Sequence, residues 1–266
     1  MENHVVPDNI WESDGTPYRG WQRQTKPRNT VQEVIENVLS KVFKKKVTAN
    51  GCGRTDAGVH ALSQVFDFKT DIDRDHKNWI DGMNSNLPDS ISIKSISNVS
   101  EDFHSRFSAL DRSYTYVVYN SKTKPLFFDR LVHWDDNLIE FSIIKEQANM
   151  FLGSHDFTSF RSSRCSSKNP VKEIKNIEVT KKDNFIFITI KANAFLHNMV
   201  RIMAGTLIDI AKGEINTSIN EILLEMNRAA AGKTASAKGL FFLGPKYNSQ
   251  FNIQSPTMNI MDKFKS

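Results

Sequence analysis

Cysteine is scarce in this chain of 266 residues, which holds only Cys52 and Cys165. The two lie far apart, and neither belongs to a C-x-x-C pair. A disulfide framework or a cysteine-ligated zinc site therefore has no support in the sequence. Reduced thiols fit the cytosol, and we expect a cytoplasmic protein.

Long apolar runs are missing too. No stretch approaches the about eighteen uninterrupted apolar residues of a membrane-spanning helix, and the first residues lack the basic-then-apolar pattern of a secretory signal. We therefore expect no membrane partner. With 39% hydrophobic and 24% charged residues, the composition is that of a globular protein with one large core or two smaller ones.

The sequence also lacks clustered metal ligands. Its histidines are dispersed without ligand spacing, and the H-x-E and P-C-x-x-C motifs of zinc-dependent base deaminases do not occur. We expect no metal site. A metal-dependent hydrolase acting on RNA is disfavoured for the same reason.

The glycine-rich stretch at residues 51–60 does not fit either common phosphate loop. A dinucleotide fingerprint would need a third glycine where Asp56 stands, and a P-loop would need Lys and Ser or Thr where Val59 and His60 stand. What remains is a carboxylate on a turn, with Arg54 two residues earlier, and a nearby arginine keeps a carboxylate ionised. Taken alone, the loop is more simply interpreted as an Asx turn beside a surface arginine.

Basic residues outnumber acidic ones, 35 to 30, and they gather with aromatic residues in two loops, residues 18–28 and 157–172. Such a mixture neutralises phosphates and stacks on bases, which indicates an RNA partner. Two solvated loops with aromatic anchors are the alternative interpretation. The basic residues concerned are Arg19, Arg23, Lys26, Arg28, Arg161, Arg164, Lys168 and Lys172. Among them, Arg23, Arg161 and Arg164 are our candidates for RNA binding.

Hydrophobic periodicity predicts an α+β fold. A capping box from Thr30 to Glu33 opens the first helix. The expected helices are residues 30–44, 75–86, 138–152, 195–212 and 217–226, and the expected strands are 65–68, 91–96, 113–119, 171–179, 185–190 and 240–243. The similar order of elements in the two halves predicts an internal duplication. We expect domains at residues 1–102 and 103–250, followed by a loosely ordered tail at residues 251–266.

Six ordered motifs carry a family resemblance. They are GCGRTDAGVHALSQVFDF at residues 51–68, DGT at 14–16 with Tyr18 and GWQ at 20–22, FHSRFSA at 103–109 leading to RSYTY at 112–116, GSHDF at 153–157 with Phe160, FLHNMVR at 195–201, and TASAKGL at 234–240. Together they span most of the chain, and they resemble the signature of the TruA-type tRNA pseudouridine synthases. That family opens with an apolar strand, which Pro7, Asp8 and Asn9 interrupt here.

The resemblance implies two similar α+β sub-domains that share a mixed, largely antiparallel sheet with a central basic cleft. It further implies a homodimer that needs no cofactor. Its activity would be the isomerisation of uridine to pseudouridine at positions 38 to 40, in the anticodon stem-loop of tRNAs. The alternative from another class is an RNA-binding protein that keeps this fold without turnover.

The resemblance also assigns roles to single residues. Asp56 matches the nucleophilic aspartate, Arg54 its neighbouring arginine, Tyr114 the tyrosine that packs on the target base, and Arg201 the arginine that pairs with the aspartate. Attack at C1′ of the sugar, attack at C6 of the base and departure to a glycal all stay open. By position alone, Tyr114 is a half-buried strand tyrosine, whereas Arg201 lies on an apolar helix and needs a buried partner or a path to solvent.

Overall fold

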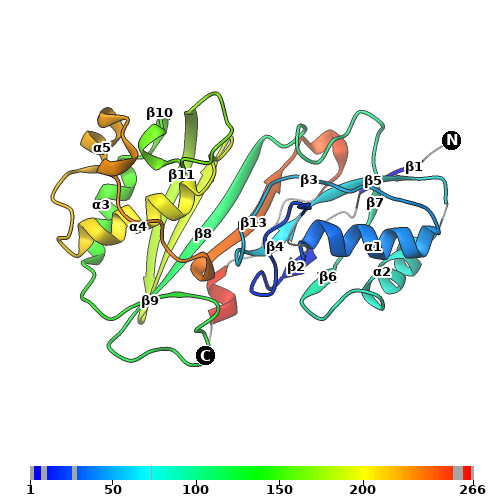
Figure 1. Cartoon of the computed structure of the whole chain (residues 1–266), viewed down its shortest axis with the longest axis horizontal. Helices are drawn as coiled ribbons and strands as arrows, with labels where there is room; N and C mark the ends of the chain where they lie inside the picture. The colour runs from blue at the N-terminus through cyan, green and yellow to red at the C-terminus, as the bar shows by residue number, and fades with distance from the viewer. Residues whose placement is uncertain (1–2, 7–10, 26–28, 73, 254–259, 265–266) are drawn as a thin grey trace. The chain divides into compact units, whose positions relative to one another are not determined.

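A computed structural model describes residues 3–6, 11–25, 29–72, 74–253 and 260–264 of the chain (Figure 1). The chain divides into two compact units. Unit 1 comprises Met1–Arg112 and Phe242–Ser266, and unit 2 comprises Ser113–Phe241. Within the described residues, no helix is long and apolar enough to cross a bilayer.

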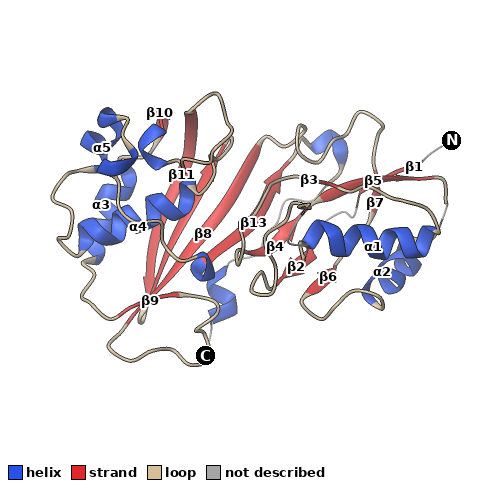
Figure 2. Ribbon diagram, in the orientation of Figure 1, coloured by secondary structure: helices blue, strands red, loops and turns tan. Residues whose placement is uncertain are grey.

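Unit 1 carries its helices against short antiparallel strands (Figure 2). Its strands run in the orders β3-β5-β1-β7 and β13-β4-β2-β6. The elements are β1 (Asn3–Val6), β2 (Trp11–Ser13), α1 (Val31–Phe43), β3 (Asn50–Gly51), β4 (His60–Gln64), β5 (Phe66–Thr70), α2 (His76–Asn84), β6 (Ile91–Ile93), β7 (Ser97–Asn98), β13 (Leu240–Lys246) and the 3-10 helices η4 (Ser249–Phe251) and η5 (Ile260–Phe264).

The first helix forms where the capping box predicts it. The Thr30 side chain accepts a hydrogen bond from the Glu33 N–H at 3.3 Å, which satisfies an N–H of the first helical turn. The apolar side of α1 belongs to a buried cluster in which Phe43 contacts Phe68 at 5.8 Å and Trp79 of α2 at 4.7 Å between ring centroids. These contacts hold both helices of unit 1 over its aromatic strands.

The interrupted first strand becomes two strands in two different sheets. β1 pairs with β5 and β7, whereas β2 lies between β4 and β6. The interrupting residues Pro7, Asp8 and Asn9 lie outside the described residues. Both flanking segments therefore still contribute to unit 1.

Unit 2 consists of mostly antiparallel strands with two helices packed beside them. Its strands run in the order β10-β11-β12-β8, and β9 adds a parallel pair with β8. The elements are β8 (Asp111–Asn120), β9 (His133–Asp135), α3 (Phe141–Asn149), β10 (Gly153–Asp156), β11 (Val171–Lys182), β12 (Phe185–Ala192), α4 (Met199–Ala211), α5 (Ile219–Glu225) and the 3-10 helices η1 (Thr158–Phe160), η2 (Arg228–Ala230) and η3 (Ala237–Gly239). The fold is thus α+β with mixed, mostly antiparallel strands, as the sequence predicts.

Helix α4 is shorter than its apolar pattern. It was expected from Phe195, but it begins at Met199 because Asn198 adopts the left-handed conformation, with φ of 61°. Helix α5 likewise begins one residue late, with Ser218 as its capping residue instead of Thr217.

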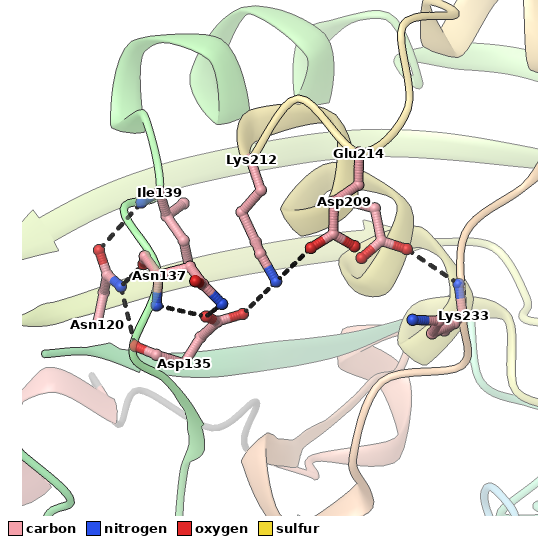
Figure 3. A network of polar contacts seen from close by, with 8 residues as sticks. All are labelled: Asn120, Asp135, Asn137, Ile139, Asp209, Lys212, Glu214 and Lys233. Carbon is pink, nitrogen blue, oxygen red and sulfur yellow. Dashed lines mark hydrogen bonds and ion pairs between the residues drawn. The ribbon is translucent and has the colours of Figure 1, made fainter. Parts of the chain in front are cut away.

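A polar network ties the C-terminal end of α4 to β8 and β9 (Figure 3). The Lys212 ammonium lies 3.0 Å from the Asp135 carboxylate and 2.8 Å from that of Glu214, and the Lys212 and Asp135 side chains are 12% and 9% exposed. Burial alone would raise the pKa of Asp135, but the Asn137 N–H and the Lys212 ammonium lower it. Burial would lower the pKa of Lys212, yet both carboxylates raise it.

The two units differ in extent from the predicted domains. The chain leaves unit 1 at Arg112, not at residue 102, and returns to it at Phe242. The physical reason is aromatic packing: Phe103 meets Tyr247 at 5.1 Å and Phe251 at 5.0 Å, both edge-on. Segments predicted to lie in the second domain therefore close the core of unit 1.

The predicted loose tail also differs from the structure where it is described. Ile260 and Phe264 of η5 are buried, at 3% and 5% exposure. The Lys263 ammonium lies 3.2 Å from the Glu12 carboxylate of β2. This part of the tail is consequently packed on unit 1.

Candidate active site

Asp56 lies on a loop of residues 52–59, called the Asp56 loop below, which connects β3 and β4. Hydrogen bonds close the base of this loop. The Cys52 N–H donates to the Val65 carbonyl at 2.9 Å, and the Gln64 side-chain amide donates to the Gly53 carbonyl at 2.9 Å. The loop therefore begins and ends at fixed points of the sheet.

The tip of the loop is a tight turn that Asp56 opens. The Val59 N–H donates to the Asp56 carbonyl at 3.1 Å, and Gly58 has φ of 77°. Residues other than glycine rarely adopt this φ, so the turn depends on Gly58. Asp56 itself is half-buried.

The segment before α1 holds the outer side of the turn. The Trp21 N–H donates to the Thr55 carbonyl at 3.1 Å, and the Gly58 N–H donates to the Tyr18 carbonyl at 3.2 Å. At Gly20, with φ of 88°, a Cβ atom would lie 2.3 Å from the Thr55 carbonyl oxygen. Only glycine permits this approach, and the approach fixes the backbone on both sides of Asp56.

Gln64 and Cys52 form a buried pair behind the loop. Both are 1% exposed, and the Cys52 thiol donates to the Gln64 amide oxygen at 2.8 Å. Burial raises the pKa of Cys52 to about 12, so the thiol keeps the proton that it donates. Gln64 thus contacts two loop residues at once. Sequence reasoning missed this role, because it expected the strand only from residue 65 and placed Gln64 outside it.

Arg112 connects the stem of the loop to the segment that precedes β8. Its guanidinium donates to the Cys52 carbonyl at 3.3 Å, to the Ala109 carbonyl at 3.1 Å and to the Arg106 carbonyl. The sequence motif contained Arg112, but its spacing did not reveal this function. Gln64 and Arg112 are positioning residues of the Asp56 loop.

The role of Arg54 beside Asp56 stays a prediction. The Arg54 side chain is exposed and, within the described residues, forms no ion pair. The guanidinium is thus accessible to an anionic group of a substrate.

Arg201 is held in unit 2 by the segment that follows η2. Its Nε donates to the Ala235 carbonyl at 2.8 Å, its Nη1 donates to the Asn198 side chain at 3.2 Å, and its own carbonyl accepts from the Ala235 N–H at 3.1 Å. These bonds explain how an arginine is accommodated on an apolar helix. The pairing of Arg201 with Asp56 stays a prediction.

Tyr114 is more buried than its strand position suggested. It is 7% exposed, and its ring stands edge-on to Phe195, with centroids 5.0 Å apart. Tyr116 is fully buried and donates to the Ser236 carbonyl at 2.8 Å. Burial raises the pKa of Tyr116, and the nearby Arg201 charge opposes this rise. Arg201 thus lies near the strand that carries Tyr114.

The candidates for RNA binding differ in their surroundings. The Arg23 guanidinium lies 2.9 Å from the Glu36 carboxylate, and the side chains are 41% and 5% exposed. Arg23 therefore also neutralises a buried carboxylate of α1. Arg164 is exposed, whereas Arg161 is half-buried and lines a recess. Their binding of RNA stays a prediction, and Lys26 and Arg28 lie outside the described residues.

The sequence matches the family described as tRNA pseudouridine synthase over residues 12–108 and 147–248. The chain belongs to this family. The matched ranges of this synthase contain Asp56, Arg54 and Arg201. Tyr114 lies between the two ranges, so its assignment depends on the RSYTY motif alone.

Relatives of this synthase extend over nearly its full length. It is 42% identical over 246 residues to tRNA pseudouridine synthase A of Photobacterium profundum, covering 92% of this chain and 94% of that one. It is 38% identical over 248 residues to the protein of the same name from Shigella boydii, covering 93% and 92%. A chain in the crystal structure of a Cbf5-Nop10-Gar1 complex is 10% identical with a TM-score of 0.36, covering 90% of this chain and 49% of that one.

Proposed function

We propose that this chain isomerises uridine to pseudouridine in tRNA, at positions 38 to 40 of the anticodon stem-loop. The observation that carries the proposal is the Asp56 loop. Its backbone is hydrogen-bonded at the base and at the tip, so a single carboxylate is held in place before substrate arrives. Fixed orientation of a reacting group lowers the barrier of a reaction that uses one nucleophile.

The reaction requires little more than such a carboxylate. The bond from N1 to C1′ breaks, the uracil turns, and a bond from C5 to C1′ forms. The C5 proton leaves and N1 regains a proton, so no redox partner and no group donor is needed. Asp56 supplies either the nucleophile at C1′ or C6, or the negative charge that assists departure to a glycal.

Three further residues complete the proposed site. Tyr114, whose ring orientation is fixed by Phe195, packs on the uracil and offsets part of the cost of unstacking it. Arg201 pairs with the Asp56 carboxylate through its guanidinium. The exposed Arg54 binds a phosphate beside the target nucleotide.

The cellular setting is proposed on narrower grounds. The relatives named above are called tRNA pseudouridine synthases, which supports tRNA as the substrate. Reduced, unpaired cysteines support a cytoplasmic enzyme. The homodimer and the absence of a cofactor follow from the family resemblance.

Incubation with tRNA, followed by mapping of pseudouridine, tests this function. The wild-type protein should modify positions 38 to 40, whereas Asp56→Asn should form no pseudouridine and still bind tRNA. Asp81→Asn is the matched control, because Asp81 is an exposed carboxylate on α2 of the same unit. Turnover by Asp56→Asn would remove Asp56 as the nucleophile. Tight tRNA binding without any product from the wild type would favour an RNA-binding protein without turnover.

A further inference from the structure

A small recess of about 230 Å³ in unit 2 has an unusual lining. The residues that line it are Thr158, Arg161, Ser162, Ser163, Cys165 and Arg228. They supply two guanidinium groups, three hydroxyls and a thiol, and none of these described lining residues is acidic. Every polar side chain in this lining is therefore able to donate a hydrogen bond.

The fold builds this recess from segments far apart in sequence. The Ser159 hydroxyl, fully buried in η1, donates to the Ile222 carbonyl of α5 at 2.7 Å. The same oxygen accepts from the Asn227 N–H at 2.9 Å, at the residue that precedes η2. These two bonds fix η1 against η2, so Arg161 and Arg228 converge on one recess.

The two arginines lack counterions within the described part of the chain. Arg228 donates to the Ala231 carbonyl at 3.1 Å and to the Thr234 hydroxyl at 3.3 Å, but neither it nor Arg161 contacts a carboxylate. Burial lowers the pKa of Arg228, although a guanidinium stays charged at any physiological pH. A partly desolvated cation without a counterion is stabilised when an anion binds to it.

We propose that this recess binds one phosphodiester group of the RNA substrate. The guanidinium groups of Arg161 and Arg228 contact the non-bridging oxygens, and the Ser162 and Ser163 hydroxyls donate to the same group. This assignment rests on the proposed function for the identity of the RNA. It adds Arg228 to the RNA-binding residues and separates Arg161 from Arg164, which is exposed and lies outside the lining.

A bound phosphate in the recess would be fixed relative to the reacting groups of unit 2. The Ser162 N–H donates to the His197 carbonyl at 3.0 Å, in the turn that leads into α4. Arg201 lies on the first turn of that helix. Phosphate binding here would therefore set the register of the RNA against Arg201.

Cys165 provides a direct probe, because it lines the recess and is partly exposed. Cys52 is buried with a raised pKa, so iodoacetamide should alkylate Cys165 selectively. An anticodon stem-loop RNA should slow this alkylation. Inorganic phosphate alone, at the same phosphate concentration, should not. Equal protection by both would show a site for free anions and would overturn the proposal.

Arginine variants supply the second measurement. Arg161→Gln and Arg228→Gln should each weaken stem-loop binding about tenfold and abolish the protection of Cys165. Because both arginines contact one phosphate, the double variant should lower the log-log salt slope of binding by about one and not two. Lys145→Gln, which removes an exposed charge from α3, should change neither quantity.

Each outcome decides one question. If Arg161→Gln keeps wild-type affinity and Cys165 protection, the recess does not bind a phosphodiester group. This variant breaks no hydrogen bond within the described residues. Pseudouridine formed by the wild type would still support the proposed function in that case. Conversely, protection of Cys165 by RNA without any isomerisation would support phosphodiester binding in the recess and refute the proposed pseudouridine synthase activity.

Discussion

The position of Asp56 depends on a residue without a side chain. Gly20→Ala should displace the Asp56 loop, because its Cβ would lie 2.3 Å from the Thr55 carbonyl oxygen. We expect a stability loss above the about 1 kcal/mol of a positive-φ alanine, and a single-turnover rate lowered about a hundredfold. Denaturant unfolding and pseudouridine formation measure the two effects.

Gly213→Ala is the control for this prediction. Gly213 has φ of 74°, but a Cβ there meets nothing within 4 Å. This variant should lose only the backbone contribution and keep full activity. If Gly20→Ala behaves like Gly213→Ala, the close approach at Thr55 does not position Asp56.

At the residue scale, sequence reasoning found Asp56 but not the residues that hold its loop. Asp56 is recognisable because glycines and a fixed motif surround it. Gln64 and Arg112 act through hydrogen bonds to backbone carbonyls that are distant in sequence. No local pattern encodes such a partner, so only the folded chain shows their function.

At the element scale, the network around Lys212 makes a testable contribution to unit 2. Lys212→Met should leave Asp135 without its ammonium partner and destabilise the protein by about 3 kcal/mol at neutral pH. Lys124→Met is the control, because the Lys124 side chain is 54% exposed where it pairs with Asp129. This surface pair should contribute less than about 1 kcal/mol.

The contribution of Lys212 should depend on pH in a defined direction. Folding lowers the pKa of Asp135, so its stabilisation is present above the unfolded value of about 3.9 and is lost as pH falls through the folded value. Folding raises the pKa of Lys212, so its stabilisation is present below about 10.4 and is lost as pH rises through the folded value. Urea unfolding from acidic to alkaline pH should show the largest difference between wild type and Lys212→Met in between. A difference independent of pH would mean that packing, not charge, accounts for it.

Elements defined by local chemistry were predicted well. The capping box identified α1, and periodicity identified strands at residues 171–179 and 185–190, which form the antiparallel pair of β11 and β12. The start of α4 was predicted too early. Apolar residues precede Asn198 in the sequence, but the left-handed backbone at Asn198 prevents the helix from including them. The separation of β1 from β2 was also hidden, because strand partners are set by the whole sheet.

At the scale of the whole molecule, unit 1 should require the segment that follows Phe241. A chain ending at Phe241 keeps all of unit 2 but loses most of β13 and the contacts of Tyr247 and Phe251 with Phe103. Hydrogen exchange should then show protection in unit 2 and its loss in unit 1. A chain ending at Ile253, which keeps these contacts, should protect both.

The outcome against this prediction is protection of residues 29–72 in the chain that ends at Phe241. The sequence could not show this division. The apolar run at residues 240–243 predicts a strand but carries no information about its partner, so the strand was assigned to the domain that it follows. The aromatic contacts of Phe103 join residues more than half the chain apart.

Because the chain returns to unit 1 at Phe242, unit 1 is completed after unit 2 during synthesis. A ribosome releases all of unit 2 before it releases the last strand of unit 1. Asp56 is among the earliest residues synthesised, yet the fold that holds it closes among the latest. A prematurely terminated chain would expose the edge of β4. Such a fragment is a substrate for chaperones and proteases and not a partly active enzyme.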